Sequence, residues 1–340
     1  MSDQKKRLII CGNGFDAHHG LGTTYFHYKH FLEEKYPRIA REYENFPGLT
    51  DSGKGFWHNI EESLEIDYEA YMGNLIEECY PDVLNNDSDS RWYDISVELD
   101  SETEFVKLFT GQCFYEFLSG VSFENRQKSP IVERFIDEQS RFLTFNYTDT
   151  LNKLYHIERN KILHIHGALK DVSLVINPPI RPDMHGIYTM EQIESMTPPD
   201  TPAINNDLIR SVIQFGAVGI TANQVEQHLY KRYSDDDFFG ASIEGAIRGL
   251  VDFVEMSTKD LNGNILNLVK YIENEELQEV VVMGHSLLSA DELYYREVLV
   301  PRLKDCKWTF MNYTRDSNCI KEIEKFISKY ELKNVIIIPW

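Results

Sequence analysis

The sequence predicts a three-layer α/β fold with a mostly parallel sheet and one helical insertion. Short runs of β-branched and other apolar residues recur along the chain, as in strands that are buried on both faces. Helical patterns separate most of these runs, and such alternation is typical of a parallel sheet. The predicted strands are RLIIC (7–11), RFLTF (141–145), KILHI (161–165), LVI (174–176), EVVVM (279–283), WTFM (308–311) and NVIII (334–338).

Residues 55–140 are predicted to be a helical insertion in a single domain whose core is 1–54 and 141–340. In the stretch FWHNIEESLEIDYEAYMGNLIEECY, apolar residues recur at helical spacing. Ser101 and Glu104 form a candidate capping box before a second helical stretch. The aromatic residues of this insertion are expected to pack in a core.

Two later segments complete the predicted organisation. The stretch 177–202 holds half of the prolines and is too long for an ordinary connection, so we expect a lid over the site or a disordered segment. Residues 241–276 are predicted to be helical, with a break at Asn262–Gly263.

Composition argues against several classes of protein. The chain has 340 residues, of which 42% are hydrophobic, and it contains no apolar run long enough for a membrane span. Five scattered cysteines without a C-x-x-C pair argue against a disulfide framework and a structural zinc site. Together with the absence of a long apolar run, this makes a cytoplasmic protein the expectation. The net charge of -21 opposes binding to nucleic acids. A small anionic ligand would need a local positive feature, such as a helix N-terminus.

A glycine-containing loop, GNGFD, follows the first predicted strand. Gly12 and Gly14 would let the backbone turn tightly and approach a ligand, and amides of the next helix could face a phosphate. The third glycine stands only at Gly20, so the dinucleotide fingerprint G-x-G-x-x-G is not met. Asp16 would repel a phosphate, so we expect it to cap the helix or to accept hydrogen bonds from a ribose hydroxyl. A plain strand-to-helix turn is the alternative.

Polar residues also follow the second predicted strand, in FLTFNYTDTL (142–151). Ligands of open α/β sheets bind at the carboxyl ends of strands, where Asn146 and Asp149 would lie. Both are therefore candidate ligand-binding residues. The alternative is that they form a turn or a helix cap together with Thr148.

The third predicted strand ends in LHIHGAL (163–169), with two histidines. His164 and His166 are two residues apart, so both side chains are expected on one face of the strand. Such a pair could bind a metal, or one histidine could be a general base while the other packs. The only other suggestive histidine is His285, so no metal is expected.

The stretch VVVMGHSLLSADELYY (280–295) repeats this design, with a strand followed by Gly284, His285 and Ser286. A hydrolase elbow, G-x-S-x-G, would need a glycine where Leu288 stands, which argues against a nucleophilic serine. A contact of this turn to ribose or phosphate fits better. Asp291 opens the helical stretch that follows.

In this order, GNGFD, FNYTDTL, HIHG and GHSL resemble the motifs of the AbiH family, which is associated with bacterial abortive infection against bacteriophage. AbiH proteins are distantly similar to sirtuin-like domains, and that resemblance implies a Rossmann-like, sirtuin-like fold and NAD as a substrate that is hydrolysed. It implies Asn146 and His166 as the catalytic residues and places Gly12, Gly14 and Ser286 at dinucleotide-contacting positions. The full set of predicted NAD-binding residues is Gly12, Asn13, Gly14, Asp16, Asp149, Gly284, His285, Ser286 and Asp291.

Two features depart from sirtuins. Deacetylase sirtuins carry four zinc-binding cysteines, and the absence of such a set argues against protein deacetylation. The Asn-Tyr-Thr-Asp pattern is one residue longer than the sirtuin-like Asn-Tyr-Asp, which leaves the role of Asp149 open.

NAD hydrolysis is chemically consistent with these residues. Nicotinamide leaves as a neutral molecule, so the site needs no general acid but must stabilise an oxocarbenium-like ribose and position a water. Asn146 is expected to hold a ribose hydroxyl or the attacking water, and His166 to act as base, with His164 packed beside it. A histidine with its ordinary pKa of about 6.5 is mostly neutral at cytoplasmic pH, as a base must be.

Two other functions stay open. The chain could be a sensor that binds NAD or ADP-ribose without turnover, or a metal-dependent hydrolase or nuclease built on His164 and His166. A second copy of the chain and a phage-derived trigger are the candidate partners besides the nucleotide, and no membrane contact is expected.

Overall fold

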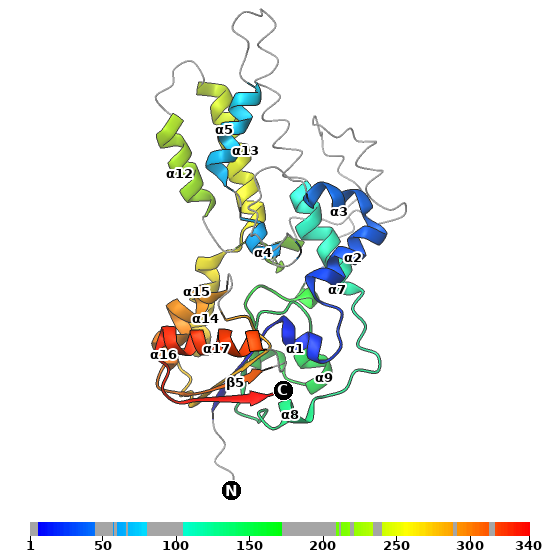
Figure 1. Ribbon diagram of the computed structural model, residues 1–340, viewed down its shortest axis with the longest axis vertical. Helices are drawn as coiled ribbons and strands as arrows, with labels where there is room; N and C mark the ends of the chain where they lie inside the picture. The colour runs from blue at the N-terminus through cyan, green and yellow to red at the C-terminus, as the bar shows by residue number, and fades with distance from the viewer. Residues whose placement is uncertain are drawn as a thin grey trace, which may run out of the picture. The chain divides into compact units, whose positions relative to one another are not determined.

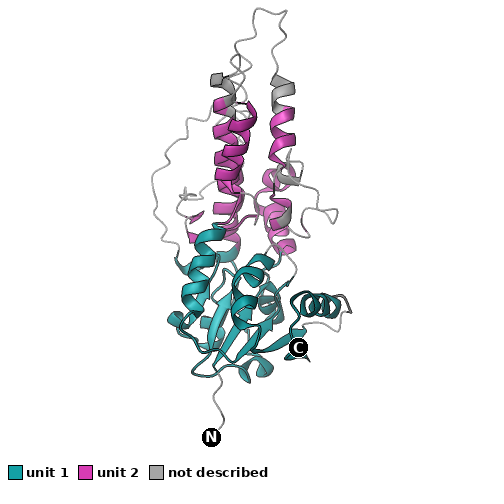
Figure 2. Cartoon of the chain, turned by 90° about the vertical axis from the view of Figure 1, so that its left-hand side faces the viewer, with its two compact units in different colours: residues 1–24, 118–172, 260–340 teal, residues 25–117, 173–259 magenta. Residues whose placement is uncertain are grey.

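The structure is a computed structural model, and its described residues form two compact units (Figure 2). Unit 1 consists of residues 1–24, 118–172 and 260–340, and unit 2 consists of residues 25–117 and 173–259. The structure describes residues 6–44, 57, 60–65, 67–79, 105–171, 209–210, 212–217, 221–233, 240–287, 291–312 and 317–340. The predictions for Ser101, Glu104, 174–176 and 177–202 lie outside these residues.

The division into units bears on the predicted domain organisation. All six named strands belong to unit 1, and the described elements of unit 2 are helices apart from one isolated bridge. The chain leaves unit 1 after residue 24 and again after residue 172. The single domain with an insertion at 55–140 stays a prediction. The boundaries between the two observed units do not coincide with the ends of that segment, because the chain passes between the units after residues 24, 117, 172 and 259.

The sheet of unit 1 has six strands in the order β3-β2-β1-β4-β5-β6, and every neighbouring pair is parallel. This is the strand order of the Rossmann fold, so the predicted α/β fold class is confirmed. The strands are β1 (Arg7–Cys11), β2 (Arg141–Thr144), β3 (Ile162–His164), β4 (Glu279–Met283), β5 (Lys307–Asn312) and β6 (Val335–Pro339).

Helices cover both faces of this sheet, which explains why its inner strands read as continuous apolar runs (Figure 1). On β1, Leu8 and Ile10 belong to the hydrophobic cluster of one face, and Ile9 and Cys11 to that of the other. The first cluster includes residues of α14 (Leu261–Ile272), α16 (Val300–Leu303) and α17 (Ser317–Tyr330). The second includes residues of α1 (Asn13–His18), α8 (Pro130–Glu133) and α9 (Thr150–Tyr155).

Unit 2 has an aromatic core around Tyr28. Its ring packs against Trp57, Phe109, Phe114, Phe117 and Phe215. Trp57, Phe109, Phe114 and Phe117, which belong to 55–140, thus pack in a core, as expected. The helical elements are α2 (Tyr25–Lys35), α3 (Pro37–Glu44), α4 (Ile60–Ser63), α5 (Tyr68–Cys79), the π-helix η3 (Phe109–Cys113), α7 (Phe114–Ser119), α12 (Ala222–Tyr233) and α13 (Gly240–Ser257).

The helix break predicted at Asn262–Gly263 is wrong. Helix α13 ends at Ser257, and α14 begins at Leu261 with Asp260 as its N-cap. The Asp260 carboxylate accepts a hydrogen bond from the Gly263 backbone N–H over 3.0 Å. The Asn-Gly pair therefore lies in the first turn of α14, because the aspartate that precedes it caps the helix. None of the described helices is long and apolar enough to cross a membrane.

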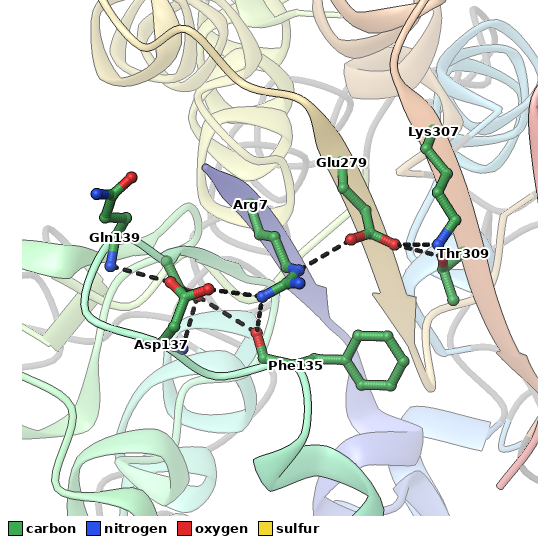
Figure 3. Close-up of polar contacts among 8 residues, drawn as sticks. Arg7, Phe135, Asp137, Gln139, Glu279, Lys307 and Thr309 are labelled. Carbon is green, nitrogen blue, oxygen red and sulfur yellow. Dashed lines mark hydrogen bonds and ion pairs between the residues drawn. The ribbon is translucent and has the colours of Figure 1, made fainter. Parts of the chain in front are cut away.

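An ion-pair network joins the amino ends of three strands, at the edge opposite the motifs (Figure 3). Glu279 of β4 accepts hydrogen bonds from Arg7 of β1 and from Lys307 and Thr309 of β5, at 2.8–2.9 Å. Arg7 also donates to Asp137 over 2.6 Å. Burial raises the pKa of Glu279, but these hydrogen bonds outweigh it, so the pKa is lowered and the carboxylate stays ionised.

Candidate functional site

The four motifs meet at one edge of the sheet. Cys11 pairs with Thr144 and with Met283, and Thr144 pairs with His164, so the loops after these strands begin at the same level. The predicted convergence is confirmed. The β1–β4 boundary is also where the strand order reverses, and ligands of open α/β sheets bind there.

The glycines of the first and fourth motifs pack directly against each other. The backbone N–H groups of Gly12 and Gly14 donate to the carbonyl oxygens of Met283 and Gly284, over 3.1 and 2.8 Å. A Cβ atom on Gly12 would lie 2.6 Å from the Cα of His285, and one on Gly14 would lie 2.8 Å from the Cα of Gly284. Both backbone N–H groups are therefore bonded within the protein, including that of Gly14, one of the α1 amides expected to face a phosphate.

Asp16 is buried and has partners in the second motif. Its carboxylate accepts hydrogen bonds from the hydroxyls of Thr148 and Thr150, over 2.5 and 2.7 Å. Burial raises the pKa of Asp16 to about 6, against the lowering effect of hydrogen bonds from Thr148, Thr150 and Asn146. The N-cap position of α1 is held by Gly12, and Asp16 lies within the helix. In this structure Asp16 joins the first and second motifs instead of capping the helix.

Asn146 also holds the first loop. Its side-chain Nδ2 donates to the carbonyl oxygen of Gly12 over 2.8 Å, and only 8% of the residue is exposed. The predicted catalytic amide thus has a structural contact. The neighbouring Asn13 is exposed at the same loop, where its Oδ1 accepts a hydrogen bond from the Thr23 hydroxyl over 2.8 Å.

His164 has a defined tautomer. Its Nδ1 lies 3.0 Å from the backbone carbonyl oxygen of Asn146, which can only accept, so Nδ1 carries the proton. Nε2 is then an unprotonated nitrogen, buried and without a hydrogen-bond partner among the described residues. Burial lowers the pKa of His164 to about 4. Nearby, Asp149 forms an ion pair with Lys170 over 2.7 Å.

His166, Asp291 and His285 form a buried cluster, which we call the His–Asp–His cluster. The two Asp291 oxygens lie 3.4 Å from Nε2 of His166 and 3.5 Å from Nε2 of His285. The Phe145 ring packs against both imidazoles, with ring centroids 5.5 and 4.0 Å away. A carboxylate between two imidazoles can orient either ring. When one of the rings takes up a proton, the carboxylate stabilises the imidazolium that forms.

Two tyrosines that the sequence analysis did not single out hold this cluster. The Tyr294 hydroxyl shares a hydrogen bond with Nε2 of His166 over 3.2 Å, and the Tyr295 hydroxyl shares one with Nδ1 of His285 over 3.0 Å. Asn264 donates to the Tyr294 hydroxyl over 3.2 Å. The π-helix η6 (Tyr295–Leu299) begins here, and π-bulges are frequent at functional sites. The sequence feature that could have pointed to these tyrosines is their position in the fourth motif, where both follow Asp291 by three or four residues.

A cavity of about 210 Å³ opens beside the fourth motif. Ser286 lines it and donates to Glu322 of α17 over 3.1 Å, and the Leu287 backbone N–H donates to the same carboxylate oxygen over 2.8 Å. Glu322 has no motif around it and was missed. The described lining residues are Gly14, Val282, Gly284, His285, Ser286, Leu287, Phe310, Met311, Cys319, Glu322 and Ile323.

The predicted residues thus fall into three groups. The first group contacts other parts of the protein through hydrogen bonds or an ion pair and consists of Gly12, Asn13, Asp16, Asn146 and Asp149. His166, His285 and Asp291 form one cluster, and Gly14, Gly284 and Ser286 line the cavity. Within the part of the chain that the structure describes, no group of three or more histidines, cysteines or carboxylates is placed to hold a metal ion.

Comparison with known proteins gives a family. The family model described as "Bacteriophage abortive infection AbiH" matches residues 8–313, a range that contains all four motifs. No curated protein and no solved structure matches the chain.

Proposed function

This chain belongs to the AbiH family of bacteriophage abortive infection proteins, and we propose that it acts in that defence by hydrolysing NAD between nicotinamide and ribose. The single observation that carries this proposal is the His–Asp–His cluster at the carboxyl ends of β3 and β4. It puts a histidine supported by a carboxylate at the edge where open α/β sheets bind nucleotides.

In this proposal His166 is the base. It takes the proton of the attacking water while nicotinamide leaves as a neutral molecule, and Asp291 stabilises the imidazolium that forms. His166 is only 2% exposed and is flanked by Phe145 and Tyr294, so the charge develops away from bulk water, where the carboxylate acts more strongly. The Asn146 Oδ1 accepts a hydrogen bond from the ribose or from that water.

The test follows nicotinamide. Purified protein is incubated with NAD, with and without lysate from phage-infected cells, and nicotinamide and ADP-ribose are measured by chromatography. We expect both products in equal amounts in at least one of the two conditions. NAD that stays intact in both conditions would overturn hydrolysis.

A specific observation favours a second function, a nucleotide sensor without turnover. The side-chain Nδ2 of Asn146, the predicted catalytic amide, is bonded to the Gly12 carbonyl oxygen, a contact that holds the first loop and performs no catalytic step. A protein that binds NAD or ADP-ribose in calorimetry and releases no nicotinamide would be that sensor.

A further inference from the structure

The last strand of the sheet, β6, has an exposed apolar edge (Figure 1, red). Among the described strands, β6 has only β5 as a neighbour, so it ends the sheet. Ile336 is 44% exposed and Ile337 is 38% exposed. Successive side chains of a strand point to opposite faces, so these two isoleucines expose apolar surface on both faces of the sheet at this edge.

The backbone of β6 turns a defined set of polar groups outward. The Asn334 carbonyl oxygen and the Trp340 N–H both bond to β5, each over 2.8 Å. The N–H and C=O groups alternate in direction along a strand, so those of Val335 and Ile337 point away from β5. Pro339 also falls on the outward side, where its missing N–H costs no bond to β5. The outer edge therefore offers two residues with a donor and an acceptor each.

Charge favours a second copy of this chain as the partner of that edge. The net charge of -21 makes two copies repel each other over most of their surfaces, but the segment 334–340 contains no charged residue. Edge strands of monomeric proteins are commonly protected by a charged side chain or a bulge, and from Val335 to Ile338 β6 has neither. A contact between two β6 strands brings no carboxylates together.

We propose that β6 pairs with β6 of a second copy in an antiparallel ladder, so that the two sheets become one continuous sheet. A two-fold axis between identical edges makes the pairing antiparallel. When Val335 pairs with Ile337 of the second copy, every outward N–H and C=O group of these residues is bonded. Ile336 then lies at the axis opposite Ile336 of the second copy, in a pair whose Cα atoms are about 4.5 Å apart. This assembly is independent of any reaction with NAD.

Sedimentation equilibrium of the full chain tests the association. A strand edge is a small interface, so we expect a monomer–dimer equilibrium with a dissociation constant in the micromolar range. Ile336→Lys puts two ammonium groups opposite each other at the axis and should weaken the dimer by about tenfold or more. Leu266→Lys makes the same change at a 59% exposed residue of α14 and should leave the dissociation constant as in the wild type.

Disulfide crosslinking tests the register. In the Ile336→Cys variant the two Cα atoms would be about 4.5 Å apart, within the range of a disulfide, so mild oxidation should give a covalent dimer on a non-reducing gel. Ile337→Cys is the matched control, because position 337 lies opposite Val335 and not opposite its own counterpart. Wild-type protein treated in the same way controls for the native cysteines, of which Cys306 and Cys319 are partly exposed.

Three results would overturn the proposal. The first is a chain that stays monomeric at the highest concentration that remains soluble, which would show that the edge of β6 has no such partner. The second is a dimer that Ile336→Lys leaves intact, which would place the interface elsewhere. The third is crosslinking in Ile337→Cys but not in Ile336→Cys, which would exclude this register. Melting temperatures of all variants control for folding.

Discussion

Gly14 and Gly284 are in backbone contact: the Gly14 N–H donates to the Gly284 carbonyl oxygen over 2.8 Å, and a Cβ atom on Gly14 would lie 2.8 Å from the Gly284 Cα. Gly284 also has a φ of +61°, in the left-handed region that favours glycine. The first and fourth motifs therefore hold each other in place at the centre of the site.

Substitution of Gly14 by alanine should destabilise the protein. The added methyl group meets backbone and not a flexible side chain, and overpacking of this kind costs about 1–3 kcal/mol. Gly245→Ala is the matched control, because nothing lies within 4 Å of its Cβ and alanine favours the helix α13. Thermal melts should show a lower melting temperature for Gly14→Ala only. Equal melting temperatures for both variants would contradict the prediction, because they would show that the backbone at Gly284 makes room for the methyl group without loss of stability.

Asp16 should make the protein more stable as the pH falls from 7 towards 4. Its pKa in the folded state is about 6, above the ordinary value of 3.8, so the folded state binds the proton first. At about 1.4 kcal/mol per unit, the gain is up to about 3 kcal/mol. Urea unfolding at a series of pH values should show this gain in the wild type relative to Asp16→Asn. A constant difference between the two proteins would contradict the raised pKa.

His164 should have the opposite effect over a similar range. Its pKa falls from 6.5 to about 4 on folding, so the unfolded state binds the proton first, and stability is lost as the pH falls from about 6.5 to 4. His164→Asn keeps a side-chain N–H for the Asn146 carbonyl and removes the titrating group. In the same urea series, this variant should lose up to about 3 kcal/mol less than the wild type. A parallel decline in both proteins would count against this assignment.

The proposed chemistry predicts that His166 and Asp291 are needed for nicotinamide release. His166→Ala should lower the rate by about 100- to 10,000-fold, the usual contribution of a general base. Asp291→Asn should lower it as well, because the neutral amide cannot stabilise the imidazolium. Nicotinamide formed per protein is the readout, and melting temperatures control for folding. Full activity in a folded His166→Ala variant would remove His166 from the mechanism.

Asn146→Ala should lower both activity and stability. The expectation from sequence was a catalytic amide, but the structure adds its hydrogen bond to the Gly12 carbonyl. Its loss should cost about 0.5–1.5 kcal/mol, because the Gly12 carbonyl oxygen keeps its other donor, the Phe15 backbone N–H. Denaturant unfolding and nicotinamide release measure the two effects. A variant of unchanged stability would show that the Gly12 contact contributes little.

The strands and the convergence of the motifs could be predicted from the sequence. In a strand buried on both faces, such as β4 (Glu279–Met283), the residues after Glu279 are all apolar, and that run is visible locally. Parallel pairing then places all strand ends at one edge, so Gly12 and His166 had to lie near each other.

The partners of each polar side chain could not be predicted in this way. Asp16 and Thr148 are 132 residues apart, and His166 and Tyr294 are 128 apart, so no local pattern connects them. The two histidines of HIHG illustrate this limit: they are alike in sequence, yet His164 bonds to Asn146 and His166 to Tyr294. Glu322 reaches the GHS turn from the last helix of the chain.

The sequence by itself determined the α/β class, the strands and the edge at which the site lies, because hydrophobic periodicity and turn residues act over a few neighbours. Only the tertiary structure decided that Gly12 and Gly14 pack on the GHS turn, that Asp16 bonds to threonines and that Asp291 lies between two histidines. These contacts depend on which loops the folded sheet brings together, and a buried polar group takes whichever partner the packing places within reach.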